Sequence, residues 1–255
     1  ANNISNEVVA SVPSISRGHT DFTKMNPLAN TSGSGTSFAG ASNRYNQFAI
    51  DGLVTNDVFG LTSSGTNGGQ AGIEPISLDA IEEFQINIAP YDVRESGFTG
   101  GGINAITKSG TNKFTGSAYY YGNNAKLVGK NEPVSNTESP IADYTDYQLG
   151  FTLGGPIVQN KLFFFVNGEI TRKSYPLGNV PGTAASNITL EEINKVLAVL
   201  DRVAPSYDAG EYLDINSETN SNKVLAKLNW NISNKHKLVL RHSYTYGENI
   251  NISRT

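Results

Sequence analysis

Apolar side chains recur at every second position in several long stretches after residue 112, and this pattern constrains the fold more than any other feature. In the stretch 147–154, Tyr, Leu, Phe and Leu occupy the odd positions, and Gln, Gly, Thr and Gly the even ones. Such alternation places apolar residues on one face of a β-strand and polar residues on the other. The stretches 223–230 (Leu225 excepted) and 237–246 repeat it, and 114–121 and 161–170 are further candidates. The sequence therefore predicts five long strands.

The connections between these strands alternate in length. Residues 123–143 and 172–222 form long connections, whereas 155–160 and 231–236 are short. Outer-membrane β-barrels alternate in this way, because their periplasmic turns are short and their extracellular loops are long. Strands of roughly 9–11 residues suit a tilted bilayer crossing, and Trp230 and tyrosines near strand ends suit interfacial aromatic girdles. The pattern favours a transmembrane antiparallel β-barrel whose polar residues face a filled lumen. The alternative is a soluble carbohydrate- or protein-binding β-sandwich, because its buried apolar faces have the same period.

The first 112 residues differ from the rest in composition, because they are rich in Gly, Ser, Asn and Thr. Short apolar stretches separated by polar loops predict a small α/β domain with long connections. The expected elements are a strand at 46–54 with a turn at Asp51-Gly52, a short helix at 75–83 capped by Ser77, and strands at 84–88 and 103–107.

Composition argues against several classes of protein. With 19 basic and 23 acidic side chains and a net charge of -4, the chain offers no basic surface for nucleic acid. The absence of cysteine removes disulfides, thiolate metal sites and cysteine nucleophiles. His19, His236 and His242 lack metal-ligand spacing, no Gly-x-Ser-x-Gly elbow occurs, and Thr107 stands where a phosphate loop needs glycine. We therefore expect no cofactor, no metal ion and no enzyme activity.

The second long loop contains a strong helix signal. Thr189 and Glu192 have the spacing of a capping box, and apolar residues at helical spacing follow them. The sequence thus predicts an amphipathic helix of about 14 residues. Such a helix could line an extracellular vestibule or contact a surface lipoprotein, but we expect it to bury its own apolar stripe within the loop. The stripe is Ile193, Val196, Leu197, Leu200 and Val203.

Several motifs follow one another in the order found in TonB-dependent outer-membrane receptors. Phe48-Ala-Ile-Asp-Gly52, Ile81-Glu-Glu-Phe-Gln-Ile86 and Ala89-Pro-Tyr-Asp92 resemble the plug domain of those receptors, and Gly100 to Asn112 resembles its end. Phe114 to Tyr119 then resembles the first barrel strand, and Leu153 to Phe165 a barrel hairpin. The resemblance runs from about Val12 to Tyr246 and is closest to the Oar-like subgroup of Bacteroidetes receptors. Its plug-motif residues are Asp51, Gly52, Glu82, Glu83, Gly100, Gly101, Gly102, Asn104, Thr107 and Lys108.

The resemblance implies a barrel of about 22 strands with an N-terminal α/β plug domain. Residues 1–112 would be the plug and 113–255 the first five strands, too few to close a barrel, so we expect a fragment. It further implies active import across the cell outer membrane, gated by the plug and driven by TonB acting on a segment upstream of this chain. Outer-membrane lipid is a further implied partner. The Oar-like type suggests peptides or protein fragments as cargo, with oligosaccharides and metal chelates as alternatives. At the plug apices the expected cargo contacts are Arg44, Tyr45, Asn56, Asp57 and Phe59.

One motif departs from the pattern of siderophore receptors. Those receptors read Ile-Glu-Arg-Ile-Glu-Val-x-Arg-Gly-Pro where this chain has Gln85, Ile88 and Ala89. The arginine and second glutamate that help to lock a plug to its barrel are therefore absent, which favours the Oar-like type.

Overall fold

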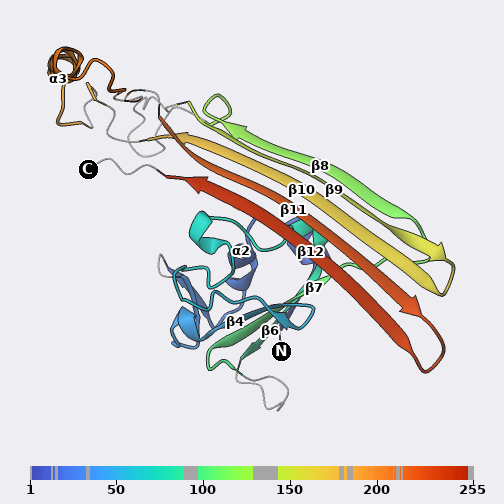
Figure 1. Cartoon of the computed structure of the whole chain (residues 1–255). Coiled ribbons are helices and arrows are strands. Elements are labelled where there is room, and N and C mark those ends of the chain that lie inside the picture. The colour runs from blue at the N-terminus through green and yellow to red at the C-terminus, as the bar shows by residue number, and fades with distance from the viewer. Residues whose placement is uncertain are drawn as a thin grey trace. The chain divides into compact units, whose positions relative to one another are not determined.

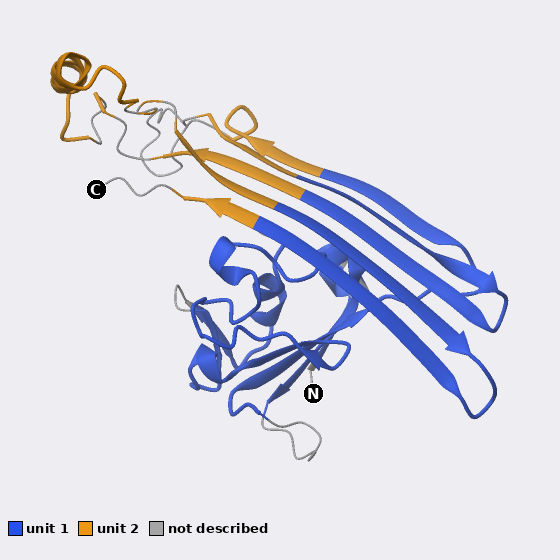
Figure 2. Cartoon of the chain, viewed as in Figure 1, with its two compact units in different colours: residues 1–120, 148–170, 221–247 blue, residues 121–147, 171–220, 248–255 orange. Residues whose placement is uncertain are grey.

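The structure, a computed structural model, describes residues 2–251 except 13, 15–16, 33–34, 89–96, 129–142, 178–180, 183–185, 209, 211–212 and 214. The Ala89–Asp92 motif and most of the first long loop lie outside the described residues. The chain divides into two compact units (Figure 2): residues 1–120, 148–170 and 221–247, and residues 121–147, 171–220 and 248–255. The first unit holds the N-terminal domain and the larger part of each long strand. The second holds the remaining strand ends and the segments that join them.

The N-terminal domain is built on a mixed five-stranded sheet of order β1-β6-β7-β4-β5 (Figure 1). Strand β4 runs parallel to β7, and the other neighbours are antiparallel. Strands β2 and β3 form a separate hairpin. The elements are β1 (Asn2–Ser5), α1 (Asn6–Ser11), α2 (His19–Thr23), β2 (Ala29–Ser32), β3 (Gly35–Phe38), η1 (Asn43–Tyr45), β4 (Gln47–Ile50), β5 (Leu53–Val54), η2 (Gly69–Ala71), η3 (Leu78–Ala80), β6 (Ile81–Ile88) and β7 (Gly101–Thr107).

The core of this domain forms where the apolar side of β6 meets α2. Phe84 and Ile86 are fully buried, as the predicted alternation requires, and the Phe84 ring stacks on Phe22 with centroids 5.9 Å apart. A Cβ added at Gly101 would lie 2.4 Å from the Phe38 ring, so glycine there allows that ring to pack against β7. The same apolar cluster includes Phe165 and Leu225 of the long strands.

The predicted strand at 46–54 with its turn at Asp51-Gly52 is confirmed, and the turn divides it into β4 and β5. Asp51 and Gly52 join β4 to β5 with φ values of +48° and +80°. Positive φ at both central residues is the geometry of a type I′ turn, which favours Asp-Gly. The backbone N–H of Gly52 donates to Asn104 Oδ1 at 2.9 Å, which ties the turn to β7.

The predicted helix at 75–83 is wrong. Only the short 3-10 helix η3 forms, and β6 begins at Ile81 rather than at the predicted Phe84. Ser77 occupies the N-cap position, but its side chain makes no capping hydrogen bond. Its hydroxyl donates instead to Glu169 Oε2 at 2.7 Å. A long-range contact thus uses the group that the local pattern assigned to a cap.

The five long strands form a second sheet in chain order, and neighbouring strands run in opposite directions (Figure 1). Short turns at 159–161 and 232–236 confirm the predicted short connections. The strands exceed the predicted length, with 14–16 residues in all but the first, which has 10. The last four strands are therefore longer than a bilayer crossing requires. Their bounds are β8 (Thr115–Asn124), β9 (Thr145–Val158), β10 (Leu162–Pro176), β11 (Asn216–Asn231) and β12 (Lys237–Ile250).

On the three middle strands, β9 to β11, apolar residues of one face are exposed and residues of the other face are buried or half-buried, whereas β8 and β12 are exposed along most of their length. On β9, Tyr147, Leu149, Phe151 and Leu153 are exposed, whereas Gly150 and Gly154 are buried. On β11, Trp230 is exposed while Lys223 and Lys227 retain only 6% and 7% of their accessible surface. A soluble sandwich would bury the apolar faces instead. Leu225, the predicted exception to the alternation, lies on the buried side.

The predicted helix in the second long loop is confirmed as α3 (Leu190–Val203), with 14 residues. Thr189 and Glu192 make both hydrogen bonds of the capping box. The expectation that α3 buries its apolar stripe is met only in part, because Ile193, Leu197 and Leu200 are half-buried whereas Val196 and Val203 are exposed, Val196 to 59%. Within the described residues, no helix has the length and apolar character to cross a bilayer.

Replacing Thr189 with alanine is expected to destabilise α3 by about 1 kcal/mol, because it removes the side-chain acceptor at the N-cap. Amide hydrogen exchange across the first turn of α3 should accelerate about fivefold. Thr189→Ser keeps the hydroxyl and should exchange like the wild type. Equal exchange in all three proteins would show that the cap does not stabilise the helix.

Candidate functional site at the interface of the N-terminal domain and the long strands

Within the first compact unit, two clusters of polar side chains join the N-terminal domain to the buried face of the long strands, here called the strand wall. The Glu169 cluster consists of Ser77, Tyr119, Glu169 and Lys223. The Asp51 cluster consists of Asp51, Thr107, Lys227 and Arg241.

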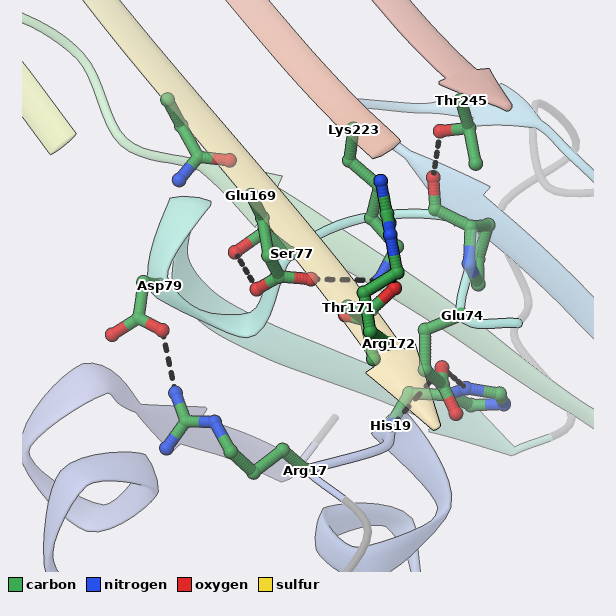
Figure 3. A network of polar contacts seen from close by, with 12 residues as sticks. Arg17, His19, Glu74, Ser77, Asp79, Glu169, Thr171, Arg172, Lys223 and Thr245 are labelled. Carbon is green, nitrogen blue, oxygen red and sulfur yellow. Dashed lines mark hydrogen bonds and ion pairs between the residues drawn. The ribbon is translucent and has the colours of Figure 1, made fainter. Parts of the chain in front are cut away.

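The Glu169 cluster is built around one buried carboxylate on β10 (Figure 3). Glu169 Oε1 accepts from Lys223 Nζ at 2.8 Å, and Oε2 accepts from Ser77 Oγ at 2.7 Å and Tyr119 Oη at 2.9 Å. A Cβ added at Gly150 would lie 2.2 Å from Tyr119 Oη, so glycine makes room for the tyrosine on this face. The ion-pair partner of Lys223 thus lies on the strand wall itself, and the N-terminal domain adds the hydroxyl of Ser77 as a hydrogen-bond donor to Glu169.

Two ion pairs of the N-terminal domain lie near this cluster (Figure 3). Arg17 pairs with Asp79, and the Arg17 guanidinium lies 5.6 Å from the Tyr119 ring centroid. His19 Nδ1 lies 2.7 Å from Glu74 Oε2. Burial opposes ionisation of Glu74, but the charge and hydrogen bonds of His19 outweigh it and hold the Glu74 pKa below its ordinary value. The charged groups of these two pairs, Arg17 with Asp79 and His19 with Glu74, thus compensate one another within the N-terminal domain.

The Asp51 cluster connects charges across the interface. Asp51 Oδ1 accepts from the Thr107 N–H at 2.8 Å, and Oδ2 accepts from Thr107 Oγ1 at 2.7 Å. Arg241 Nη1 of β12 and Lys227 Nζ of β11 lie 3.1 and 3.4 Å from the same Oδ2. Arg241 also donates to the carbonyl of Ile50 at 2.6 Å, and Lys227 to that of Thr107 at 3.1 Å. One carboxylate of the N-terminal domain therefore holds two cations of the strand wall.

The ionised form of Asp51 is favoured. Burial opposes ionisation, but the side-chain and backbone hydrogen bonds from Thr107 and the charges of Lys227 and Arg241 outweigh it and lower the Asp51 pKa. A lowered pKa in the folded state stabilises the fold above the unfolded pKa of about 3.9, and this stabilisation is lost as the pH falls through the folded value.

The β4–β5 hairpin carries Asp51 at its turn and is here called the Asp51 hairpin. Its attachment to the strand wall should therefore be independent of pH from neutrality to about pH 4 and weaken only in stronger acid. A spin label at Leu53→Cys, an exposed position next to the turn, reports this attachment as restricted motion. Below pH 4 its mobility should rise, and Asp51→Asn should abolish that step. An unchanged acid step in Asp51→Asn would assign the titration to another group.

The expected cargo-contact residues occupy the loops around η1 and after β5. Tyr45 and Phe59 are exposed, Phe59 to 81%, and Arg44 is exposed beside Tyr45. Asn56 accepts from the Phe48 N–H at 2.6 Å, and Asp57 accepts from the N–H groups of Phe59 and Thr62. Asn56 and Asp57 thus shape the loop, and Arg44, Tyr45 and Phe59 point outward from it. Contact with cargo stays a prediction for all five.

The plug-motif residues have different roles in the structure. Asp51 and Thr107 belong to the Asp51 cluster, and Asn104 binds Gly52. The backbone N–H groups of Gly100 and Gly101 donate to Tyr45 O and Asn46 Oδ1, that of Lys108 donates to Ala80 O, and Gly102 packs beneath Phe98. Glu82 is exposed, and Glu83 accepts from Gln85.

Sequence reasoning missed the strand residues of both clusters. The alternation in 223–230 predicts that Lys223 and Lys227 share the polar face of that strand, but it predicts neither their burial nor their partners. One signal could have indicated these contacts. A charged residue on a strand face that is expected to face a filled lumen must be buried, and a buried charge needs a partner of opposite charge. The missed residues are Tyr119, Glu169, Lys223, Lys227 and Arg241. In the described part of the chain, no group of three or more His, Asp or Glu residues could hold a metal ion.

Comparisons with known proteins agree with this architecture. The family model "Outer membrane beta barrel domain" matches residues 106–188. The TonB-dependent transporter Oar of Myxococcus xanthus is 31% identical over 154 residues, which are 58% of this chain and 14% of that protein. The siderophore receptor PirA of Acinetobacter baumannii superposes with a TM-score of 0.65 at 18% identity, over 98% of this chain and 32% of that one. The outer membrane transporter YddB of Escherichia coli gives 0.63 at 17% identity, over 97% and 33%.

These matches establish the location and the fold. The chain is an outer-membrane protein similar to a TonB-dependent transporter, and it has the fold of the matched part of these receptors. Its five long strands form an open sheet rather than a closed barrel. The chain spans 14% of the curated relative and about a third of the two solved structures.

Proposed function

We propose that the chain forms the plug domain and the first five strands of an Oar-like, TonB-dependent outer-membrane transporter. In this proposal residues 1–112 fill the lumen of a barrel of about 22 strands. The observation that carries it is the inverted polarity of the long-strand sheet: the apolar face is exposed, and the face with the lysines is buried against the N-terminal domain. The same observation disfavours a soluble binding module. The similarity to Oar supports the Oar-like type, whereas a Bacteroidetes origin is supported only by the sequence motifs.

The proposed activity is import of peptides or protein fragments. Cargo would bind at the outer face, and TonB would act on a segment upstream of the plug and remodel it. The interface suits this movement, because much of it consists of polar contacts that water can replace. Glu169 and Lys223 can stay paired on the wall when Ser77 withdraws. TonB, outer-membrane lipid and a surface lipoprotein are the proposed partners, and the matched relatives are transporters and receptors rather than enzymes.

A disulfide across the interface tests the gating step. A Cβ on Gly247 of β12 would lie 3.0 Å from Ile73 Cγ1 and 1.7 Å from Ile73 Cδ1. Replacing both residues with cysteine removes the isoleucine atoms that crowd this position, and the Cβ of residue 73 is bonded to the Cγ1 atom that lies 3.0 Å away. The two Cβ atoms are therefore close to the spacing of about 3.5–4.5 Å that a disulfide requires. The 255 residues of this chain contain no other cysteine.

Cells that express the complete gene with Ile73→Cys and Gly247→Cys should import a fluorescently labelled tryptic digest of casein only after reduction. Under oxidising conditions uptake should fall to that of a strain lacking TonB, and dithiothreitol should restore it. Each single variant should import under both conditions. Full uptake by protein that mass spectrometry shows to be cross-linked would contradict a plug that must move.

A further inference from the structure

The strand wall of the first compact unit carries more cations than anions. Its strand segments contain Glu169 as their only acidic residue. Glu169 neutralises Lys223, the lysine directly beside it. Lys237 lies exposed at the strand end. Lys227 and Arg241 therefore have no acidic partner on the described wall.

These two cations are compensated entirely by groups of the N-terminal domain. Lys227 contacts Asp51 and Thr107, and Arg241 contacts Asp51 and the carbonyl of Ile50. Both side chains are largely buried. Withdrawal of the Asp51 hairpin would remove the shared carboxylate and leave two positive charges facing the space that it vacates.

We propose that Lys227 and Arg241 form a carboxylate-binding site on the transport path, which Asp51 occupies in the closed state and an acidic group of the cargo occupies during passage. The inference rests on the proposed function and narrows its cargo to peptides that carry Asp, Glu or a free C-terminal carboxylate. Guanidinium and ammonium groups bind carboxylates through short, charge-assisted hydrogen bonds. Lysine and arginine side chains that line a pore favour anions and repel cations. A carboxylate of the cargo thus replaces Asp51 as the partner of Lys227 and Arg241 when the Asp51 hairpin withdraws.

The test uses two fluorescent hexapeptide amides that differ only at their two central positions. Both positions are Glu in the first peptide and Gln in the second. Cells that express the complete gene should import the Glu peptide about tenfold faster, as expected for one lost charge-assisted contact. Combined Lys227→Gln and Arg241→Gln should bring the ratio close to one. Lys237→Gln, at an exposed site on the same strand as Arg241, should keep the wild-type ratio. Equal TonB-dependent import of both peptides by the wild type would overturn the carboxylate site and leave the proposed function intact. Absence of TonB-dependent import of either peptide would overturn the proposed peptide import itself, and this inference with it.

A second measurement needs no variant that might misfold. The complete wild-type protein is reconstituted in a planar bilayer, and urea displaces the N-terminal domain. The reversal potential across a KCl gradient should then show chloride selectivity. A cation-selective conductance would overturn the inference.

Discussion

Replacing Glu169 with alanine should lower the urea midpoint for release of the N-terminal domain by the equivalent of about 3–5 kcal/mol. The substitution leaves Lys223 buried without its carboxylate, and it removes the acceptor shared by Ser77 and Tyr119. Breaking a buried pair from one side costs more than the pair contributes, because the remaining charge stays out of water. The readout is pulse proteolysis of the complete protein in detergent micelles at increasing urea concentration.

Matched variants separate the charge from the packing. Glu169→Leu combined with Lys223→Met replaces the pair by apolar groups of similar size and should recover most of the loss. Lys237→Met removes an exposed lysine and should change the midpoint by no more than about 0.5 kcal/mol. If Glu169→Ala matched that small effect, the cluster would not hold the interface together.

Phe84→Ala should destabilise the N-terminal domain by about 3–5 kcal/mol, since truncation of a buried phenylalanine loses burial and leaves a cavity. Phe84 is 0% exposed and stacks on Phe22 at the centre of the apolar core. In the complete protein, the N-terminal domain of this variant should be cleaved at a lower urea concentration, while the strands keep their resistance to protease.

The same domain provides the control. Phe59→Ala removes an identical side chain from an exposed loop and should change the free energy of unfolding by no more than about 0.5 kcal/mol. If Phe84→Ala and Phe59→Ala lowered the free energy of unfolding by similar amounts, the assignment of Phe84 to the core and Phe59 to the surface would be contradicted.

Features set by neighbouring residues could be predicted from the sequence. The turn at Asp51-Gly52 follows from two residues that accept positive φ, and α3 follows from a capping box and an apolar stripe within one segment. The alternation in β9 and β11 also predicted which side chains share a face. In each case the relevant contacts lie within a few residues or follow from the strand period.

Contacts between distant segments could not be predicted. Asp51 and Arg241 are 190 positions apart, and no local pattern pairs them. Ser77 shows the same difficulty, because a serine before a turn looks identical whether it caps a helix or binds Glu169. The sequence lacks the arginine and the second glutamate that help to lock the plug of siderophore receptors. The structure nevertheless contains ion pairs between the N-terminal domain and the strands, with the acid, Asp51, on the domain and the bases, Lys227 and Arg241, on the strands.

Spin labels placed singly at positions 148, 149, 151, 152 and 153 of β9 test most directly which face touches lipid. The complete protein, reconstituted in liposomes, is probed with oxygen, which concentrates in the bilayer, and with a water-soluble nickel chelate. The exposed apolar positions 149, 151 and 153 should collide strongly with oxygen and weakly with nickel, and 148 and 152 should be shielded from oxygen by the N-terminal domain. Equal oxygen access at all five positions, or the reverse alternation, would contradict a sheet whose apolar side faces the membrane.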